Sequence, residues 1–360
     1  MKKNKSVAIL LTIMVLAIVG FVVYNNKGER ASGNVIRIGA ILPLTGNRAE
    51  YGRDSLEALR VAEQLYADKL RANGDTIEII VEDSKSTPQG AINGYQAIRA
   101  KYPSCKIMFT QGSSIASVIS DFTARDRVIQ ISNAGNAIPA TTNPFFFACS
   151  IDEKSAAEMY DKQVKRGERC LVFYLDDDLG TTVFKEMTRL GGNKYFGIPF
   201  THTAESRDIV AKSHFDSYDT IAVVGLGPNV VRIIKTLRES GYNGVILGAE
   251  TVITEENKKL LAGFTKNLYC LTTTQLSAGT RNVFLNRFGR RVLSISHTTT
   301  YDAAVLMISA SIEHFKRNGD LSDVEKLRKI MTSEENIKNA PCLKSIENQK
   351  FKYNMEFLPL

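Results

Sequence analysis

Hydrophobic residues along the chain follow two alternating patterns. Residues 36–42 form a nearly continuous apolar run, which indicates a strand buried on both faces of a parallel sheet. After a Pro-Leu-Thr-Gly loop, apolar residues recur every three or four positions from Leu56 to Leu70, which indicates a helix with one buried face. Asn73 and Gly74 then supply a good helix end. The chain therefore opens with a strand, a loop and a helix.

The same sequence of strand, loop and helix recurs and restarts after residue 149. The expected strands are 36–42, 77–81, 105–112, 128–132, 145–149, 170–175, 220–227 and 244–250. The expected helices are 56–70, 91–100, 114–125, 153–165, 181–191 and 228–241. Two successive runs of such units predict an α/β protein with two doubly wound parallel-sheet lobes. No Gly/Ser-rich or Pro-rich linker separates them, so we expect short strands to join the lobes as a hinge.

Length and composition agree with two ordinary globular domains. The chain has 360 residues, of which 44% are hydrophobic and 23% are charged. The formal net charge is +8, but the first 30 residues supply half of it and no block of Lys or Arg follows. The remainder is only mildly basic, which argues against nucleic acid as a partner.

The N-terminus predicts export. Three lysines precede an uncharged apolar run over residues 7–24, which is long for a signal peptide and long enough to span a membrane. The nearest small-x-small site, at residues 31–33, follows a polar stretch, and no Cys follows the run for lipid attachment. We expect residues 1–34 to be a retained membrane anchor and linker with the lysines in the cytoplasm. Cleavage and secretion are the alternative.

The cysteines do not indicate a metal site. Five are spread along the chain without CxxC or Cys/His spacing, at Cys105, Cys149, Cys170, Cys270 and Cys342. An odd number in an exported protein leaves at least one thiol free, and we expect most of them to be small buried apolar side chains.

Motifs for catalysis or cofactor binding are incomplete. The stretch GLGPNV at residues 225–230 resembles half of a dinucleotide fingerprint, but Val230 replaces the third glycine and Pro228 suits a helix start. Residues 176–178 are three acids before a helix, a typical solvated helix start as well as a conceivable metal site. The four histidines are scattered, with no nucleophile motif near them. We therefore expect no enzymatic activity and no cofactor or metal.

Polar residues at the strand ends favour binding of a small charged molecule. Ser113 and Ser114 begin a helix after a strand, where N–H and hydroxyl groups suit a carboxylate, although both could serve only as helix caps. Glu250 ends a strand of the second half and offers an acceptor for an ammonium group.

The order of these motifs is similar to that of a known family. The chain resembles the type I periplasmic binding proteins of the branched-chain amino-acid (Leu/Ile/Val) group, which feed ABC importers. The resemblance spans residues 35–331. It rests on IRIGAILPLTGNRAEYG, VEDSKSTPQGAINGYQAI, TQGSSIAS, VIQISNAGN, VFYLDDDLG, VILGAET and TTTYDAAVLMISASIEHF, in this order and spacing.

The resemblance implies two lobes joined by three crossovers, with the ligand enclosed between them. We place the crossovers near Cys149, near Leu271 and within residues 335–342. The implied first lobe comprises residues 35–148 and 272–335, and the second comprises residues 149–271 and 336–360.

In the first lobe the resemblance implies four kinds of ligand contact. Tyr51 matches an aromatic residue beside the ligand side chain, and either Ser113 or Ser114 matches a serine that binds the carboxylate. Ala134 matches a residue whose backbone carbonyl meets the ammonium group. Asn136 stands where the family usually has a threonine donor.

In the second lobe Glu250 matches the acid that pairs with the ammonium group. Two positions depart from the family pattern, because Leu179 replaces an aromatic residue and Leu226 and Gly227 stand where another often lies. These losses predict a ligand side-chain pocket that is larger or more aliphatic than usual.

These features predict a non-enzymatic extracytoplasmic solute-binding protein, tethered to the cytoplasmic membrane or secreted. Its ligand is expected to be an amino acid or a similar small zwitterion, delivered to an ABC permease. The alternative is a membrane-tethered ectodomain of the same fold that senses a ligand or binds a partner without transport.

Overall fold

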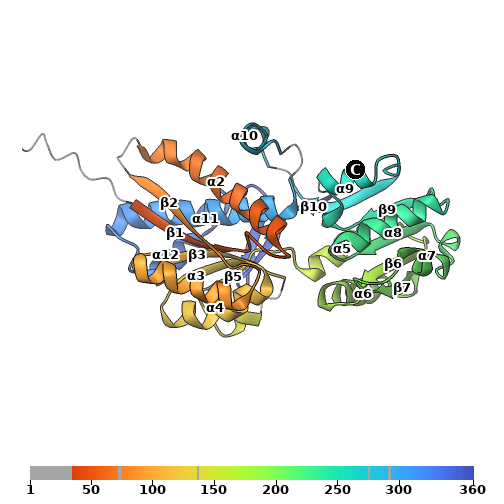
Figure 1. Cartoon of the computed structure of the whole chain (residues 1–360), viewed down its shortest axis with the longest axis horizontal. Coiled ribbons are helices and arrows are strands. Elements are labelled where there is room, and N and C mark those ends of the chain that lie inside the picture. The colour runs from red at the N-terminus through yellow and green to blue at the C-terminus, as the bar shows by residue number, and fades with distance from the viewer. Residues whose placement is uncertain (1–34, 72–74, 136–137, 254, 275, 291–292) are drawn as a thin grey trace, which may run out of the picture.

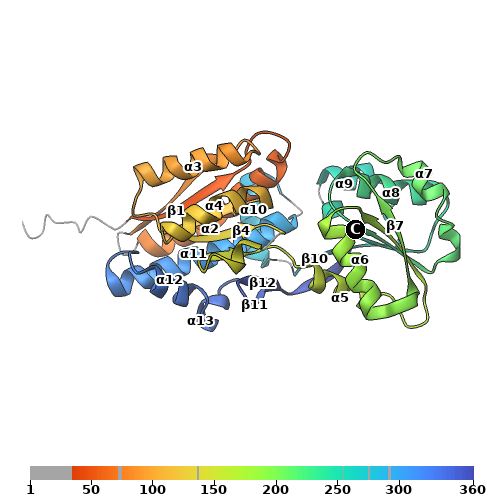
Figure 2. The ribbon, with the colours of Figure 1, turned by 90° about the horizontal axis from the view of Figure 1, so that it is seen from below.

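The computed structural model describes residues 35–360, apart from 72–74, 136–137, 254, 275 and 291–292. The expected membrane anchor in residues 1–34 lies outside this part of the chain. Among the described residues, no helix is both long enough and apolar enough to cross a membrane. Figures 1 and 2 show the chain folded into two lobes that lie end to end along the longest axis.

The first lobe is built on a seven-stranded sheet in the described part of the chain, with the strand order β11-β12-β5-β4-β3-β1-β2. Its strands are β1 (Val35–Leu42), β2 (Thr76–Asp83), β3 (Ile107–Gln111), β4 (Ile129–Asn133), β5 (Phe146–Ala148), β11 (Leu343–Glu347) and β12 (Lys350–Tyr353). Its helices are α2 (Ala49–Arg71), α3 (Pro88–Lys101), α4 (Ser113–Arg125), η1 (Ile138–Thr141), α10 (Ala278–Phe288), α11 (Ile295–Asn318), α12 (Val324–Met331) and α13 (Glu334–Ile337).

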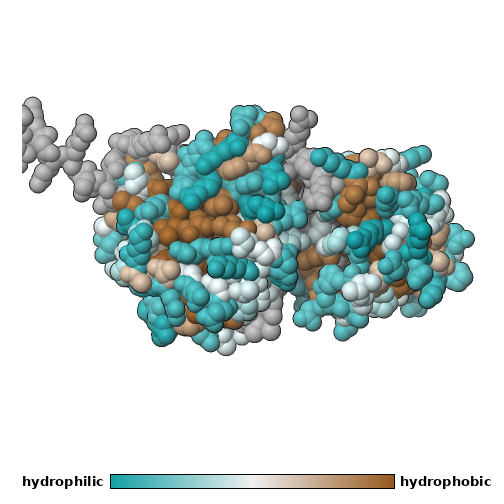
Figure 3. All heavy atoms as spheres, viewed as in Figure 1, coloured by the Kyte–Doolittle hydropathy of each residue, from teal (hydrophilic) through white to brown (hydrophobic). Residues whose placement is uncertain are grey.

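Helices cover both faces of this sheet because its central strands are apolar on both sides. Ile38 of β1 packs in a core with α2, α11 and α12. Ile41 of the same strand packs in a second core with α3 and α4. In Figure 3 hydrophobic side chains line the strip over β1 between helices, and hydrophilic ones cover the helices' outer faces.

The second lobe has a six-stranded sheet among the described residues, with the order β13-β10-β9-β8-β6-β7. Its strands are β6 (Cys170–Leu175), β7 (Tyr195–Phe200), β8 (Thr220–Val224), β9 (Val245–Gly248), β10 (Leu268–Thr273) and β13 (Met355–Pro359). Its helices are α5 (Glu153–Gln163), α6 (Asp178–Gly191), η2 (Gly192–Lys194), α7 (Ser206–Ala211), η3 (Phe215–Ser217), α8 (Pro228–Glu239), η4 (Glu250–Ile253) and α9 (Glu255–Leu260). Two apolar cores again lie on opposite faces of the sheet.

The prediction of two doubly wound α/β lobes is confirmed, with strands that the pattern did not reveal. Edge strand β7 contains Gly197 and Pro199, residues that weaken a strand signal and are tolerated at a sheet edge. The C-terminal strands β11 and β13 pair antiparallel with β12 and β10, so each parallel sheet has an antiparallel addition.

The third crossover lies later in the chain than the expected residues 335–342. Because β11 and β12 belong to the first sheet and β13 to the second, the chain crosses at Asn354. Residues 336–353 therefore belong to the first lobe, and the expected second-lobe boundary at 336 is wrong. The other crossings lie between β5 and α5 and between β10 and α10, beside Cys149 and Thr274.

Hydrogen bonds join the three crossings to one another. Tyr353 Oη donates to the carbonyl oxygen of Cys149 over 2.9 Å. The amide of Thr274 donates to the carbonyl of Asn354 over 2.9 Å, and the Asn354 amide donates to Cys342 over 2.9 Å. The Cys342 thiol in turn donates to the carbonyl of Thr274 over 2.8 Å. The hinge is thus a single bonded unit.

All five cysteines are buried free thiols, which confirms the sequence interpretation. Burial raises the pKa of Cys170 and of Cys270 to about 12, so these thiols stay protonated inside the second lobe.

A buried carboxyl group, Asp302 of α11, supports this hinge. Its side chain is fully buried, and its Oδ2 accepts the amide of Cys342 over 3.0 Å. Its Oδ1 has no hydrogen-bond partner among the described residues. Burial raises the pKa of Asp302 well above its usual range, against the hydrogen bonds from Cys342 and Leu343, and so favours the neutral carboxyl in the folded protein.

Asp302→Asn should therefore change how stability depends on pH. In the unfolded chain Asp302 ionises above about pH 4, so ionisation favours unfolding as pH rises toward the raised pKa of the folded state. Relative to the variant, the wild type should lose about 1.4 kcal/mol of unfolding free energy per pH unit in that window. Urea unfolding of both proteins at several pH values measures this slope. Asp216→Asn, at an exposed position, is the control. A difference in unfolding free energy between the wild type and Asp302→Asn that stays constant with pH would contradict a neutral carboxyl in the folded protein.

Candidate functional site

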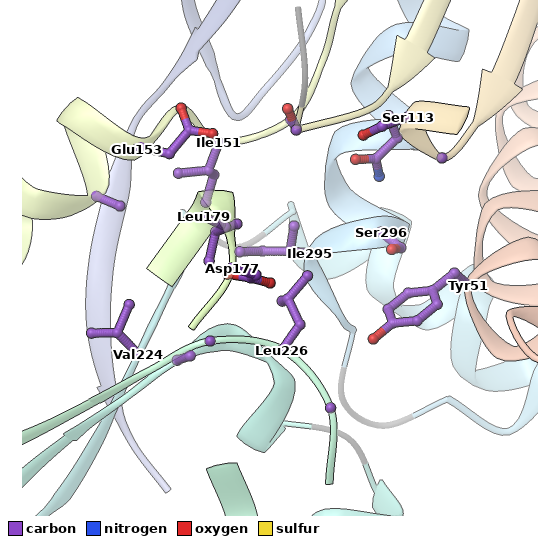
Figure 4. A pocket seen from close by; sticks show the side chains of 18 of the residues that line it. Tyr51, Ser113, Ile151, Glu153, Asp177, Leu179, Val224, Leu226, Ile295 and Ser296 are labelled. Carbon is purple, nitrogen blue, oxygen red and sulfur yellow. The ribbon is translucent and has the colours of Figure 1, made fainter. Parts of the chain in front are cut away.

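A cavity of about 400 Å³ lies between the lobes, within the range of small-molecule sites. Its walls come from the carboxyl ends of the parallel strands and from the starts of the helices that follow them. The helices α2, α4 and α11 begin at its first-lobe side, and α5, α6 and α8 begin at its second-lobe side. Figure 4 shows Tyr51, Ser113 and Ser296 facing Leu179, Asp177 and Leu226 across this cleft.

The Pro-Leu-Thr-Gly loop is held in place by the loop after β2. Asp83 accepts hydrogen bonds from the amides of Leu44, over 2.9 Å, and Lys85, over 2.7 Å, and from the Thr45 hydroxyl, over 2.7 Å. Burial alone would raise the pKa of Asp83, but the hydrogen bonds from Thr45, Lys85 and Leu44 outweigh it and lower the pKa. Ser86 accepts the amide of Arg48 over 3.2 Å, so the loop tip is fixed at the cleft.

Tyr51, which the resemblance places beside the ligand side chain, lies in the first turn of α2 and lines the cleft. Gly52 explains how this turn sits so close to the loop. A Cβ at Gly52 would lie 2.2 Å from the carbonyl oxygen of Pro43, so a larger residue would push α2 and Tyr51 away.

The start of α4 is suited to an anion. Its N-cap is Gly112, with φ of +99°, which has no side chain to cap the first N–H groups. Arg48 Nη1 lies 3.7 Å from the point that a Cβ of Gly112 would occupy, so a guanidinium stands beside this helix start. Ser113 lines the cleft, whereas Ser114 is exposed and is not among the lining residues that the structure describes. Of the two serines, only Ser113 shares the described lining of the cleft with Tyr51.

Two further ligand contacts were expected in the first lobe, at Ala134 and Asn136. The carbonyl of Ala134 accepts a hydrogen bond from Ser150 Oγ over 2.6 Å, and Ser150 itself lines the cleft. Asn133 also lines the cleft, and its amide nitrogen donates to Thr299 over 3.0 Å. Asn136 lies outside the described residues.

The second lobe contributes a mostly aliphatic wall. Leu179 and Leu226, at the two positions where aromatic residues were expected from the family pattern, both line the cleft. Val183 and Val224 lie beside them, and Ile151 follows the first crossing.

Two carboxyl groups stand in this aliphatic wall. Asp177 is the N-cap of α6, where its Oδ1 accepts the amide of Gly180 over 2.8 Å. Glu153 begins α5, and burial raises its pKa despite its own backbone N–H and the charges of Lys350 and Lys352.

Glu250 is placed only through its backbone, at the start of η4 directly after Ala249, which lines the cleft. Its side chain is not among those that the structure describes.

Sequence reasoning missed Arg48, Glu153 and Asp177 as residues of the cleft. The signal for Arg48 was present, because it belongs to the same loop tip as Tyr51. Asp177 had been noted only as one of three acids before a helix. Glu153 carried no local signal, since its place depends on the path of the first crossing. No group of three or more His, Cys, Asp or Glu within the described ranges is arranged to hold a metal ion.

Comparison with solved structures shows the same fold in several binding proteins. The branched-chain amino-acid transporter substrate-binding protein LivJ from Streptococcus pneumoniae, in complex with isoleucine, superposes with a TM-score of 0.73 at 16% identity. That match covers 91% of this chain and 96% of that one. The leucine-binding protein LivK from Thermotoga maritima gives 0.70 at 17% identity, covering 89% and 94% of the two chains.

A third similar structure holds a different kind of ligand. A solute-binding protein of an ABC transporter from Rhodopseudomonas palustris, in complex with 3,4-dihydroxybenzoic acid, gives a TM-score of 0.69 at 17% identity. The match covers 90% of this chain and 92% of that one. At these identities the likeness shows the fold. No curated protein matches the chain in sequence.

The sequence profile of the periplasmic binding protein family matches residues 35–348, which is most of the chain. With two doubly wound lobes around a cleft, the chain belongs to the periplasmic binding protein family, a family of non-enzymatic substrate-binding proteins.

Proposed function

We propose that this protein captures an amino acid or a similar small zwitterion between its lobes and delivers it to an ABC importer. The observation that carries the proposal is the opposite polarity of the two walls of the cleft. The first-lobe wall presents Arg48 and the start of α4, and the second-lobe wall presents Asp177 and Glu153. A molecule with separate negative and positive groups fits this arrangement.

The carboxylate of such a ligand fits the start of α4. A helix N-terminus favours an anion through its N–H groups and dipole, and a guanidinium offers two parallel donors to a carboxylate. Ser113 adds a hydroxyl at the same place. Arg48, Ser113 and the α4 amides are therefore our proposed carboxylate site, with Tyr51 beside the ligand side chain.

The ammonium group fits the second lobe. We propose Glu250 as its main partner, from its match to the family acid and from its position next to Ala249. The carbonyl of Ala134 and the side chain of Asn136 are proposed as further partners from the same match.

The relatives support an amino-acid ligand without deciding it. One similar structure contains isoleucine and another is described as leucine-binding, but a third contains an aromatic acid without an amino group. We also propose that the protein works outside the cytoplasm, is tethered through residues 1–34 and delivers its ligand to an ABC permease. These proposals rest on the family and on the apolar N-terminal run.

A screen of ligands by thermal unfolding tests the proposal. At a concentration of one hundred times its Kd, a ligand of the native state should add about 2.7 kcal/mol to the unfolding free energy and so raise Tm. We expect at least one of the standard amino acids to raise Tm, and the matching acid without the amino group to have little effect. Aromatic acids that raise Tm while every amino acid fails would contradict the proposal.

Substitutions in the proposed carboxylate site and at Glu250 should each weaken ligand binding. Loss of a hydrogen bond to a charged group costs about 1.5–3 kcal/mol, so Ser113→Ala and Arg48→Ala should each raise Kd by roughly 10- to 100-fold. Glu250→Gln should raise it by a similar factor. The matched controls are Ser114→Ala and Arg53→Ala, both at exposed neighbouring positions.

Titration calorimetry with the best amino acid from the screen measures these affinities. Equal losses in Ser113→Ala and Ser114→Ala would show a general effect on α4 instead of a ligand contact. An unchanged Kd in Glu250→Gln would remove Glu250 from the proposed site.

Binding should also close the cleft. Lobes joined at one hinge can rotate with little repacking of either core, and a ligand held by both walls favours the closed arrangement. Small-angle X-ray scattering should give a smaller radius of gyration at saturation with the same amino acid. An unchanged radius at saturation would contradict closure.

A further inference from the structure

The cleft holds more negative than positive charge. Within the described part of the chain, the lining contains one guanidinium group, Arg48 on the first-lobe side, and two carboxyl groups, Glu153 and Asp177 on the second-lobe side, where the imidazole of His202 also lies. The proposed partner of the ammonium group, Glu250, would add a third carboxylate. A zwitterion has no net charge, so its binding would leave this excess uncompensated.

Among the described residues neither Glu153 nor Asp177 forms an ion pair, and the charges of Lys350 and Lys352 reach Glu153 only from a distance. Asp177 accepts a backbone amide of its own helix, from Gly180, and Glu153 accepts its own backbone N–H. The nearby Lys352 pairs instead with Asp152, over 2.9 Å between Nζ and Oδ2. Both carboxyl groups are therefore available to a ligand.

Closure of the lobes makes the imbalance costly. Residues that line the cleft lose water when the walls approach, and a carboxylate that loses water needs a cation or must take up a proton. Glu153 is already half-buried, and this burial raises its pKa. A second positive charge on the ligand would allow the cleft to close with its charges balanced.

The surroundings of the two acids fit an aliphatic chain with a charged end. Ile151 and Leu179 lie beside Glu153 and Asp177 on the same side of the cleft, opposite Ser113 (Figure 4). Methylene groups of a ligand would pack on the two apolar side chains, while a terminal cation reaches the carboxylates. An uncharged aliphatic side chain would fill the same space but leave both acids unpaired.

We propose that the ligand is an amino acid with a cationic side chain, and that Glu153 and Asp177 select it by binding the distal positive charge. This inference rests on the proposed function and names the substrate class of the same cleft. Its carboxylate would bind at Arg48 and the start of α4, and its α-ammonium group at Glu250.

Titration calorimetry with L-lysine and L-norleucine tests the selection, because these amino acids share a carbon chain and differ in the terminal ammonium group. A hydrogen-bonded charge pair is worth about 1.5–3 kcal/mol, so lysine should bind roughly 10- to 100-fold more tightly than norleucine. L-arginine should share this advantage. Cadaverine, which has both amines but no carboxylate, should bind more weakly than lysine.

Glu153→Gln and Asp177→Asn should each lower the ratio of lysine affinity to norleucine affinity, since the distal charge of lysine loses a partner that norleucine does not use. Asn also caps helices well, so the second change preserves the start of α6. Glu158→Gln and Asp176→Asn, at exposed positions outside the described lining, are the matched controls and should keep the full preference.

The outcomes separate this inference from the function on which it rests. Norleucine or leucine binding as tightly as lysine would overturn the selection of a cation and leave amino-acid capture intact. Tighter binding of cadaverine than of lysine would overturn the amino-acid class. If no amino acid binds at all, the proposed function fails and this inference fails with it.

Discussion

The hydrogen bonds that link the three crossings are the constraint on which the two-lobe arrangement depends. Cys149, Thr274 and Asn354 lie on three separate passages of the chain. The backbone of each forms a hydrogen bond with another of these passages or with a residue that supports one of them. Bonds of this kind hold the passages side by side while each sheet keeps its own core. The lobes can then turn about this line, but they cannot slide apart without breaking buried hydrogen bonds.

The chemistry of the cleft follows from the direction of the strands. Because parallel strands end at the same edge, the starts of six helices meet there, and each brings its N–H groups and its first side chains. Where the helix start has Gly112 as its cap, the edge favours an anion. Where the helix start carries Asp177 or Glu153 instead, the edge of the sheet favours a cation. One backbone arrangement thus gives two walls of opposite preference.

The fold was largely predictable from the sequence, and the site only in part. Apolar runs and helical spacing are local signals, so β1, β6 and α8 could be located from neighbouring residues alone. Strand β13 could not, because it is a strand only through its pairing with β10, 80 or more residues earlier. The choice between Ser113 and Ser114 depends on the direction of each side chain at the start of α4, which spacing does not give. Arg48 needed the packing of two loops to place its guanidinium beside Gly112.

The C-terminal strands also affect the order in which the protein can fold. The first sheet lacks β11 and β12, and the second lacks β13, until residues 343–359 have been synthesised. Neither lobe is a continuous segment, so its early strands wait for partners from the far end of the chain. Such long-range pairing slows folding and leaves strand edges open in the nascent protein. Both sheets, and the hydrogen bonds of the hinge that involve Cys342 and Asn354, are therefore complete only once these last strands are in place.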